Sequence, residues 1–264
     1  MSIDYDKNQI CPICRTQKLK VDFSAVDYMS GKVFPISRCL ACGSGVTDID
    51  LSDNLADFYG HLYYVNLKSI SENIINYFRV KKVLDLVDHN RPRYLLDVGC
   101  GNGSFILRLR RVGWGAFGTE VAPPEHLKNG VDKFISKGDL LEIGLIQNSY
   151  DFITMWHSLE HFINPERYVT GAYRLLKDGG VILIEVPNFL SWQAVIFKSN
   201  WFHLDVPRHI SHFSSRGLSY MLSGAGFKDV RVANGSFIYQ FFGYLQSILN
   251  VFSLRKNMLF DFVN

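Results

Sequence analysis

Residues 95–105 read Leu-Leu-Asp-Val-Gly-Cys-Gly-Asn-Gly-Ser-Phe, with glycine at positions 99, 101 and 103. A short apolar strand here runs into a turn with glycine at every second position, and the helix-like segment 104–112 follows. Glycines in such a turn permit positive φ and let a ligand approach the backbone closely, and a helix N-terminus presents N–H groups without helical partners. The stretch therefore predicts a strand–turn–helix unit suited to binding a ligand.

Three cofactor motifs compete for this turn, and a purely structural turn is the alternative to all of them. A phosphate-binding P-loop needs a lysine after the glycines, and none is present. A dinucleotide fingerprint needs a third glycine or alanine where the chain has Ser104. The remaining feature is Asp97, an acidic strand end two residues before Gly-x-Gly-x-Gly. This pattern resembles the first motif of the class I S-adenosylmethionine (SAM) methyltransferases.

Further strands and carboxylates follow in an order that supports this resemblance over residues 70–230. Apolar strands are expected at residues 116–121, before Asp139, at 150–156 and at 181–188, with helices between them. The sequence thus predicts an α/β fold: a doubly wound, Rossmann-like and mostly parallel methyltransferase sheet. Asn234-Gly235 between apolar runs predicts a hairpin. This hairpin would supply the antiparallel last strand of the fold.

The methyltransferase resemblance also implies a set of cofactor-binding residues. Glu120 ends the second strand, where a carboxylate can accept hydrogen bonds from ribose hydroxyls. Asp139 follows the third strand, where the family commonly has an acidic residue near the adenine amine. The full expected set is Asp97, Gly99, Gly101, Gly103, Glu120, Asp139, Leu140 and Trp156.

Four of the five cysteines form two Cys-x-x-Cys pairs near the N-terminus. The pairs are Cys11/Cys14 and Cys39/Cys42. Two such turns supply four thiolates in the arrangement that Zn²⁺ takes in a closed structural site. We therefore expect a small N-terminal zinc ribbon, with a redox pair or ordinary buried thiols as the alternatives. An odd cysteine count also favours a reducing compartment over a disulfide framework.

Length and composition agree with one large domain and a small appendage. With 264 residues, 47% apolar and 20% charged, the chain can bury a substantial core, which excludes disordered, collagen-like and coiled-coil classes. We expect a zinc ribbon at 1–50, a linker at 51–68, the methyltransferase domain at 69–240 and an apolar helix or tail at 241–264. The N-terminus has no apolar segment typical of a secretory signal, so the expected location is cytoplasmic.

Five of the eight histidines lie between residues 157 and 212. A neutral imidazole can accept a proton near pH 7, so we expect the general base among His209, His157 and His161, in that order. Helix caps, surface imidazoles and a histidine metal site are the alternatives. The stretch 206–214 resembles a motif of bacterial sugar methyltransferases, Tyr-His-Glu-His before an aromatic-Phe-Ser run, and His209 matches its last histidine.

The resemblance implies a small, sugar-like or glycan-linked acceptor that is methylated on O or C. A zinc-ribbon rRNA methyltransferase and a non-catalytic SAM-binding protein are the alternatives. A net charge of +3 argues against a nucleic-acid partner. Residues 232–254 carry no charge, and one apolar helix face is expected at the positions Leu245, Ile248, Leu249 and Phe252. This face would pack on the core, on a membrane surface or on a second copy.

Overall fold

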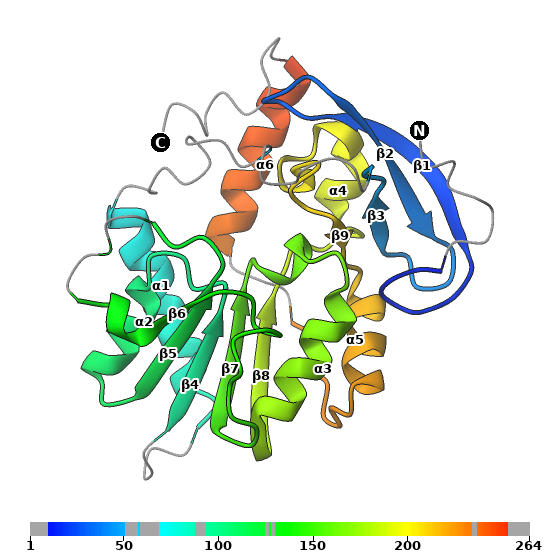
Figure 1. Ribbon diagram of the computed structural model, residues 1–264. Coiled ribbons are helices and arrows are strands. Elements are labelled where there is room, and N and C mark those ends of the chain that lie inside the picture. Colours follow the sequence, from blue (N-terminus) through cyan, green and yellow to red (C-terminus); the bar gives the residue numbers. More distant parts are fainter. Residues whose placement is uncertain are drawn as a thin grey trace. The chain divides into compact units, whose positions relative to one another are not determined.

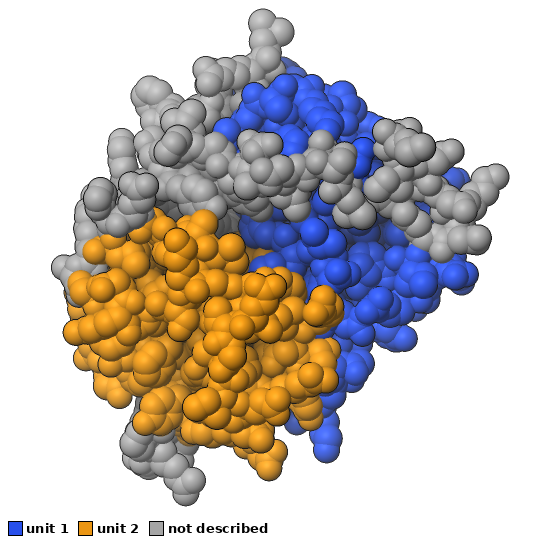
Figure 2. All heavy atoms as spheres, viewed as in Figure 1, with its two compact units in different colours: residues 1–65, 160–166, 186–264 blue, residues 66–159, 167–185 orange. Residues whose placement is uncertain are grey.

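The computed structural model describes residues 10–50, 58, 69–87, 93–124, 127, 130–233 and 237–252. The chain divides into two compact units, coloured blue and orange in Figure 2. Unit 1 comprises residues 1–65, 160–166 and 186–264, and unit 2 comprises residues 66–159 and 167–185. The expected linker lies outside the described residues except for Phe58, so its limits stay a prediction.

Unit 2 contains the predicted parallel sheet. Its strands are β4 (Tyr94–Val98), β5 (Gly115–Glu120), β6 (Ile135–Lys137), β7 (Tyr150–Trp156) and β8 (Leu176–Glu185). They lie in the order β6-β5-β4-β7-β8, and every pair is parallel (Figure 1). The order reverses between β4 and β7, as in doubly wound sheets, so ligands are expected at the carboxyl ends of these strands. The predicted α/β class and Rossmann-like sheet are confirmed.

The helices of unit 2 follow from this strand order. Helix α2 (Ser104–Arg111) connects β4 to β5, and α3 (Pro165–Leu175) connects β7 to β8 on the other side of the reversal. Right-handed crossovers that run outward in opposite directions place their helices on opposite faces of the sheet. The sheet is therefore covered on both faces, as a parallel sheet requires.

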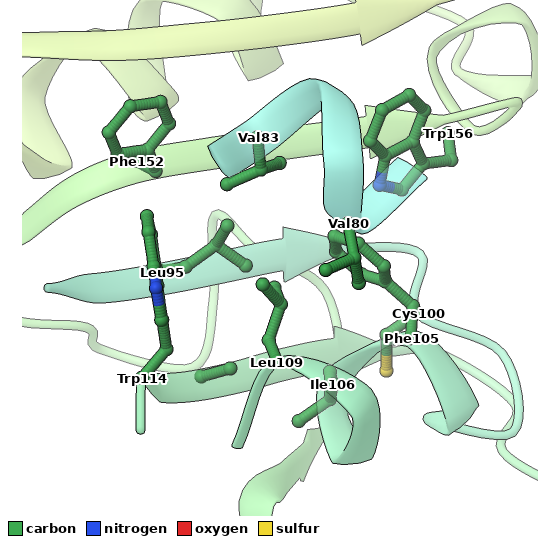
Figure 3. Packing of buried hydrophobic residues seen from close by; sticks show 11 residues of the cluster. Val80, Val83, Leu95, Cys100, Phe105, Ile106, Leu109, Trp114, Phe152 and Trp156 are labelled. Carbon is green, nitrogen blue, oxygen red and sulfur yellow. The ribbon is translucent and has the colours of Figure 1, made fainter. Parts of the chain in front are cut away.

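The core of unit 2 lies between the sheet and the pair α1 (Ser69–Leu84) and α2. Val80 and Val83 of α1 and Leu109 of α2 pack in one cluster with strand residues such as Leu95 and Phe152 (Figure 3). Each of these side chains is at most 7% exposed. Burying one Val, Leu or Phe side chain contributes about 1.5–3 kcal/mol, so the cluster holds β4 and β7 in a fixed position.

The prediction that the methyltransferase sheet ends in an antiparallel strand is wrong. Among the described residues of unit 2 all strand pairs are parallel, and Phe237–Phe252 form helix α6. The dipeptide Asn234-Gly235 lies outside the described residues. Aromatic and β-branched residues after it favour a strand locally, but the buried positions of α6 recur every three or four residues, which is the helical period.

The apolar face predicted for this segment is not its buried face. Leu245 and Phe252 are exposed, whereas Gln246, Ser247 and Asn250 are buried. The Ser247 hydroxyl accepts a hydrogen bond from the Phe202 main chain at 2.9 Å, and the Asn250 amide donates to a main-chain carbonyl at 3.1 Å. The polar face turns inward because it satisfies these main-chain groups. No described helix has the length and hydropathy needed to cross a bilayer.

Unit 1 joins the cysteine-bearing hairpin to the segment that follows β8. Its antiparallel sheet has the order β1 (Leu19–Val26), β2 (Val33–Cys39), β3 (Gly45–Thr47) and β9 (Ser211–His212). The unit also contains the helices α4 (Trp192–Phe197), α5 (Ser215–Gly224) and α6. Two short 3₁₀ helices, η4 (Lys198–Asn200) and η5 (Phe202–Leu204), follow α4. Phe34 and Ile36 of β2 share a core with Trp201 and Ile210.

Candidate functional site

The four predicted cysteines converge in unit 1. The Sγ atoms of Cys11 and Cys42 are 3.9 Å apart, those of Cys14 and Cys39 are 3.5 Å apart, and all four lie within 4.8 Å of one another. Four sulfurs at a Zn–S distance of 2.3 Å form a tetrahedron with edges of about 3.8 Å, so this arrangement fits zinc.

The two Cys-x-x-Cys turns have the same backbone geometry. Arg15 N donates to Cys11 O, and Gly43 N donates to Cys39 O, each at 2.8 Å. Arg15 and Gly43 both have positive φ, of 60° and 78°. Glycine adopts this conformation without strain, whereas Arg15 carries the strain that a non-glycine residue has there. Among the described residues, no other metal-binding side chain joins the four cysteines at this site.

In unit 2 the glycine turn connects β4 to α2 as predicted. Its three glycines have φ values between 54° and 73°. A Cβ on Gly99 would lie 2.7 Å from the Ser158 Cβ, and one on Gly103 would lie 2.6 Å from a methyl group of Val131. A Cβ on Gly101 would meet no atom of the described residues within 4 Å. Two of the glycines are thus required for packing, whereas Gly101 borders open space where a ligand can lie against the backbone.

Glu120 lies beside this open space. Its Oε2 atom accepts a hydrogen bond from Gly101 N at 2.9 Å, and its Oε1 atom accepts one from Ala122 N at 3.3 Å. Asp97 lies one strand away and is buried, and it accepts a hydrogen bond from Thr154 Oγ1 at 2.7 Å. Burial raises the pKa of Asp97 to about 7 despite this hydrogen bond. The turn thus gathers two acidic groups, which suits a cationic ligand.

The other expected cofactor residues divide into two groups. Asp139 follows β6 and accepts hydrogen bonds from Leu141 N at 2.8 Å and from the Tyr168 hydroxyl. Leu140 beside it is buried. The ring of Trp156 packs in the hydrophobic core at 5.6 Å from that of Phe105 (Figure 3). Asp139 and Leu140 follow a strand end, as predicted, whereas the Trp156 side chain belongs to the core beneath the turn.

His157 directly follows β7 and belongs to unit 2. Its backbone has a φ of 54°, and its Nε2 atom lies 3.5 Å from Oε1 of Glu185, the last residue of β8. Lys82 also donates to Glu185. Burial alone would raise the pKa of Glu185, but hydrogen bonds from His157 and Lys82 outweigh it and lower the pKa to about 2. Glu185 is therefore an ionised partner that orients the imidazole.

His161 and His209 meet in unit 1. Their rings are 4.8 Å apart. His161 Nδ1 is 3.0 Å from Arg208 O, and His209 Nδ1 is 2.9 Å from His203 O. Burial, reinforced by His209, lowers the pKa of His161 to about 4, so this imidazole is neutral at pH 7. His209 is buried, with Nε2 3.9 Å from Glu160 Oε1.

The sequence analysis missed three residues that contact the predicted site residues His157, Gly99 and Asp139. Glu185 ends a strand just as Glu120 does, and this position was a usable signal. Ser158 and Tyr168 gave no signal, because their roles depend on packing against Gly99 and on a hydrogen bond to Asp139. Ser158 Oγ and Trp156 Nε1 are buried and have no hydrogen-bond partner among the described residues. A ligand group at the turn would satisfy such a hydroxyl.

Comparison with known proteins agrees with this geometry. A family model described as a methyltransferase domain matches residues 72–232, well over half of the chain. The chain belongs to the methyltransferase domain family. The match covers the glycine turn, the whole parallel sheet and the histidines at 157–212.

Individual relatives match only part of this chain. A probable S-adenosylmethionine-dependent methyltransferase of Mycolicibacterium smegmatis is 26% identical over 139 residues, 52% of each chain. A ubiquinone biosynthesis O-methyltransferase of Pseudomonas savastanoi is 31% identical over 104 residues, 36% of this chain and 44% of that protein. The chain thus spans about half the length of the curated relatives it matches.

Among solved structures, a SAM-dependent methyltransferase from Archaeoglobus fulgidus is 27% identical with a TM-score of 0.49. That alignment covers 60% of this chain and 70% of the other. The fold assignment therefore depends on the family match and on the strand order described above.

Proposed function

We propose that this chain transfers a methyl group from SAM to a hydroxyl or carbon of a small, sugar-like acceptor. The observation that carries the proposal is the open space at Gly101, with the Glu120 carboxylate held at its N–H group. When bound, SAM supplies an activated methyl group on a sulfonium centre. The chain's own tasks are then to bind this donor, to align the acceptor and to accept a proton.

Each predicted cofactor residue has a specific task in this proposal. Glu120 accepts hydrogen bonds from the ribose hydroxyls, and Asp139 with Leu140 borders the adenine. Asp97 and the turn glycines face the methionine part, where the Ser158 hydroxyl can donate or accept a hydrogen bond. Trp156 supports the turn from the core side through its contact with Phe105.

The geometry favours His157 over His209 as the proton acceptor. His157 immediately precedes Ser158, which packs against Gly99 of the cofactor turn. Its side chain is 25% exposed, and the Glu185 carboxylate can stabilise the imidazolium that forms on protonation. The rings of His209 and His161 are instead directed by main-chain carbonyls of unit 1.

The acceptor class is tested by incubating the protein with SAM labelled in its methyl group. We expect label to enter nucleotide-linked sugars, and His157→Gln to slow turnover without changing SAM affinity. Phenolic precursors of ubiquinone and ribosomal RNA are the other arms, because relatives include quinone methyltransferases and an RNA acceptor was an alternative. Label in phenols alone, or in RNA with a steep loss as salt rises, would contradict a sugar acceptor.

We also propose that the four cysteines hold one structural Zn²⁺. The sulfur tetrahedron has the required dimensions, and a closed four-thiolate site has no open position for chemistry. Elemental analysis of protein purified without added metal should find zinc, and Cys14→Ser should lower its retention on dialysis against a chelator. Cys100→Ser is the matched control, because Cys100 lies in the core of unit 2. Zinc content unaffected by Cys14→Ser would refute the site.

A further inference from the structure

A second group of metal-binding side chains lies in unit 1, apart from the cysteines. The coordinating atoms of Glu160, His161 and His209 all lie within 4.8 Å of one another. Glu160 is 1% exposed and His209 is 8% exposed. We call these three residues the His–Glu cluster. Asp205 borders it, with Oδ2 4.0 Å from His209 Nε2.

The main chain holds the cluster in place from two segments far apart in the sequence. Glu160 and His161 belong to the 3₁₀ helix η3 (Leu159–His161), and His209 follows η5. Ile210 N donates to Glu160 O at 2.9 Å, which fixes the two segments side by side. His209 N donates to Asp205 O at 2.9 Å. The cluster is therefore built into the fold of unit 1 and does not depend on long exposed side chains.

The orientation of both imidazoles is typical of metal-binding histidines. Each Nδ1 atom lies within hydrogen-bond distance of a main-chain carbonyl, Arg208 O for His161 and His203 O for His209. A carbonyl can only accept, so each Nδ1 carries the hydrogen and each Nε2 carries the lone pair. Metal-ligating histidines commonly donate their other ring N–H to a backbone carbonyl in this way, which fixes the tautomer and the ring orientation.

The spacing of the coordinating atoms is close to that around a small cation. Nitrogen and oxygen ligands about 2.1 Å from a tetrahedral ion lie about 3.4 Å from one another. His209 Nε2 and Glu160 Oε1 are 3.9 Å apart, so an adjustment of about half an ångström would bring them to that spacing. Two imidazoles and one carboxylate form a recurrent donor set for zinc and for non-haem iron.

We propose that Glu160, His161 and His209 bind one divalent transition-metal ion of the zinc and iron(II) class. Asp205 lies at the edge of the site and is held by Arg208, whose Nε donates to its Oδ1 at 2.8 Å. Arg208 thereby keeps this second carboxylate in place beside His209. The site is separate from the cysteines and does not depend on the proposed methyl transfer.

Cobalt(II) tests this proposal because its spectrum reports the ligands. The full-length chain is stripped of metal and titrated with Co²⁺, and bound metal is counted by elemental analysis. We expect two ions per chain: one with thiolate-to-cobalt charge-transfer absorption from the cysteines, and one without it. Glu160→Gln and His209→Gln should each lose only the second ion. The thiolate absorption they retain reports that unit 1 is folded.

His212→Gln is the matched control. His212 is also a buried imidazole of unit 1, but its Nε2 lies 2.8 Å from Thr47 Oγ1, outside the cluster. This variant should keep both ions. A parent protein that takes up only thiolate-bound cobalt overturns the proposal. Undiminished uptake of the second ion by both cluster variants overturns it as well.

Discussion

Gly101→Val should lower the affinity of the protein for SAM by roughly ten- to hundredfold. No atom of the described residues lies within 4 Å of a Cβ at Gly101, so apart from backbone strain the valine side chain meets no neighbour in the absence of ligand. A ligand lying against the backbone there would clash with it. Overpacking of this kind costs about 1–3 kcal/mol, and 1.4 kcal/mol corresponds to a tenfold change in affinity. Isothermal calorimetry measures the change directly.

Gly179→Val provides the matched control for this experiment. Gly179 has a φ of 72° and also borders open space, so valine meets the same left-handed backbone strain. It lies near the start of β8, far along the strand from its carboxyl end. Both variants should lose similar stability, and only Gly101→Val should lose SAM affinity. Equal SAM affinities would mean that the cofactor does not lie against Gly101.

The parallel sheet could be predicted because its signals are local. Residues 150–156 form an apolar run that ends before a polar segment, and β7 has the predicted limits. The glycine turn, the strand before it and helix α2 follow from a continuous stretch of sequence. Carboxylates at strand ends could be placed near the cofactor turn because the carboxyl ends of parallel strands share one edge of the sheet.

The elements that could not be predicted depend on distant parts of the chain. Strand β9 pairs with β3 from far along the sequence, Gly45 opposite His212, and two residues give no strand pattern of their own. Helix α6 buries Ser247 and Asn250 because main-chain groups at Phe202 and Asn200 need partners. No hydrophobic periodicity within α6 can reveal such partners.

The same distinction applies to the candidate sites. Two Cys-x-x-Cys pairs predict a four-sulfur cluster because each pair forms its own turn. The His–Glu cluster gave no comparable signal, because Glu160 and His209 are brought together only by packing, through the hydrogen bond from Ile210 N to Glu160 O. Asp205 and His209, four residues apart, carried a weak spacing signal within one segment.

Arg208 is a buried charge that connects two segments of unit 1. Its side chain is fully buried, and its Nη2 atom lies 2.9 Å from Asp27 Oδ1 and 2.7 Å from Asp205 Oδ1. Asp27, which directly follows β1, is also fully buried and accepts hydrogen bonds from Ser30 N and Oγ. Arg208 therefore ties the β1–β2 hairpin to the segment that carries the His–Glu cluster.

Arg208→Met should lower the free energy of unfolding by about 3–5 kcal/mol. The cost comes chiefly from the carboxylate of Asp27, which would stay buried without its cation. Adding Asp27→Asn should recover part of the loss, because no uncompensated charge then remains at that position. Arg38→Met is the matched control: Arg38 pairs with Asp22 at 3.0 Å, but both side chains are 35% exposed, and a pair of this kind contributes at most about 1 kcal/mol.

Urea unfolding followed by circular dichroism measures these differences, and hydrogen exchange of residues 19–39 localises them to the hairpin. Arg208→Met should exchange these amides much faster than Arg38→Met does. If both variants unfolded at the same urea concentration, the buried ion pairs of Arg208 would not stabilise unit 1. The cost of removing Arg208, Asp27 and Asp205 from water would then equal the attraction between them, a balance that is known for buried salt bridges.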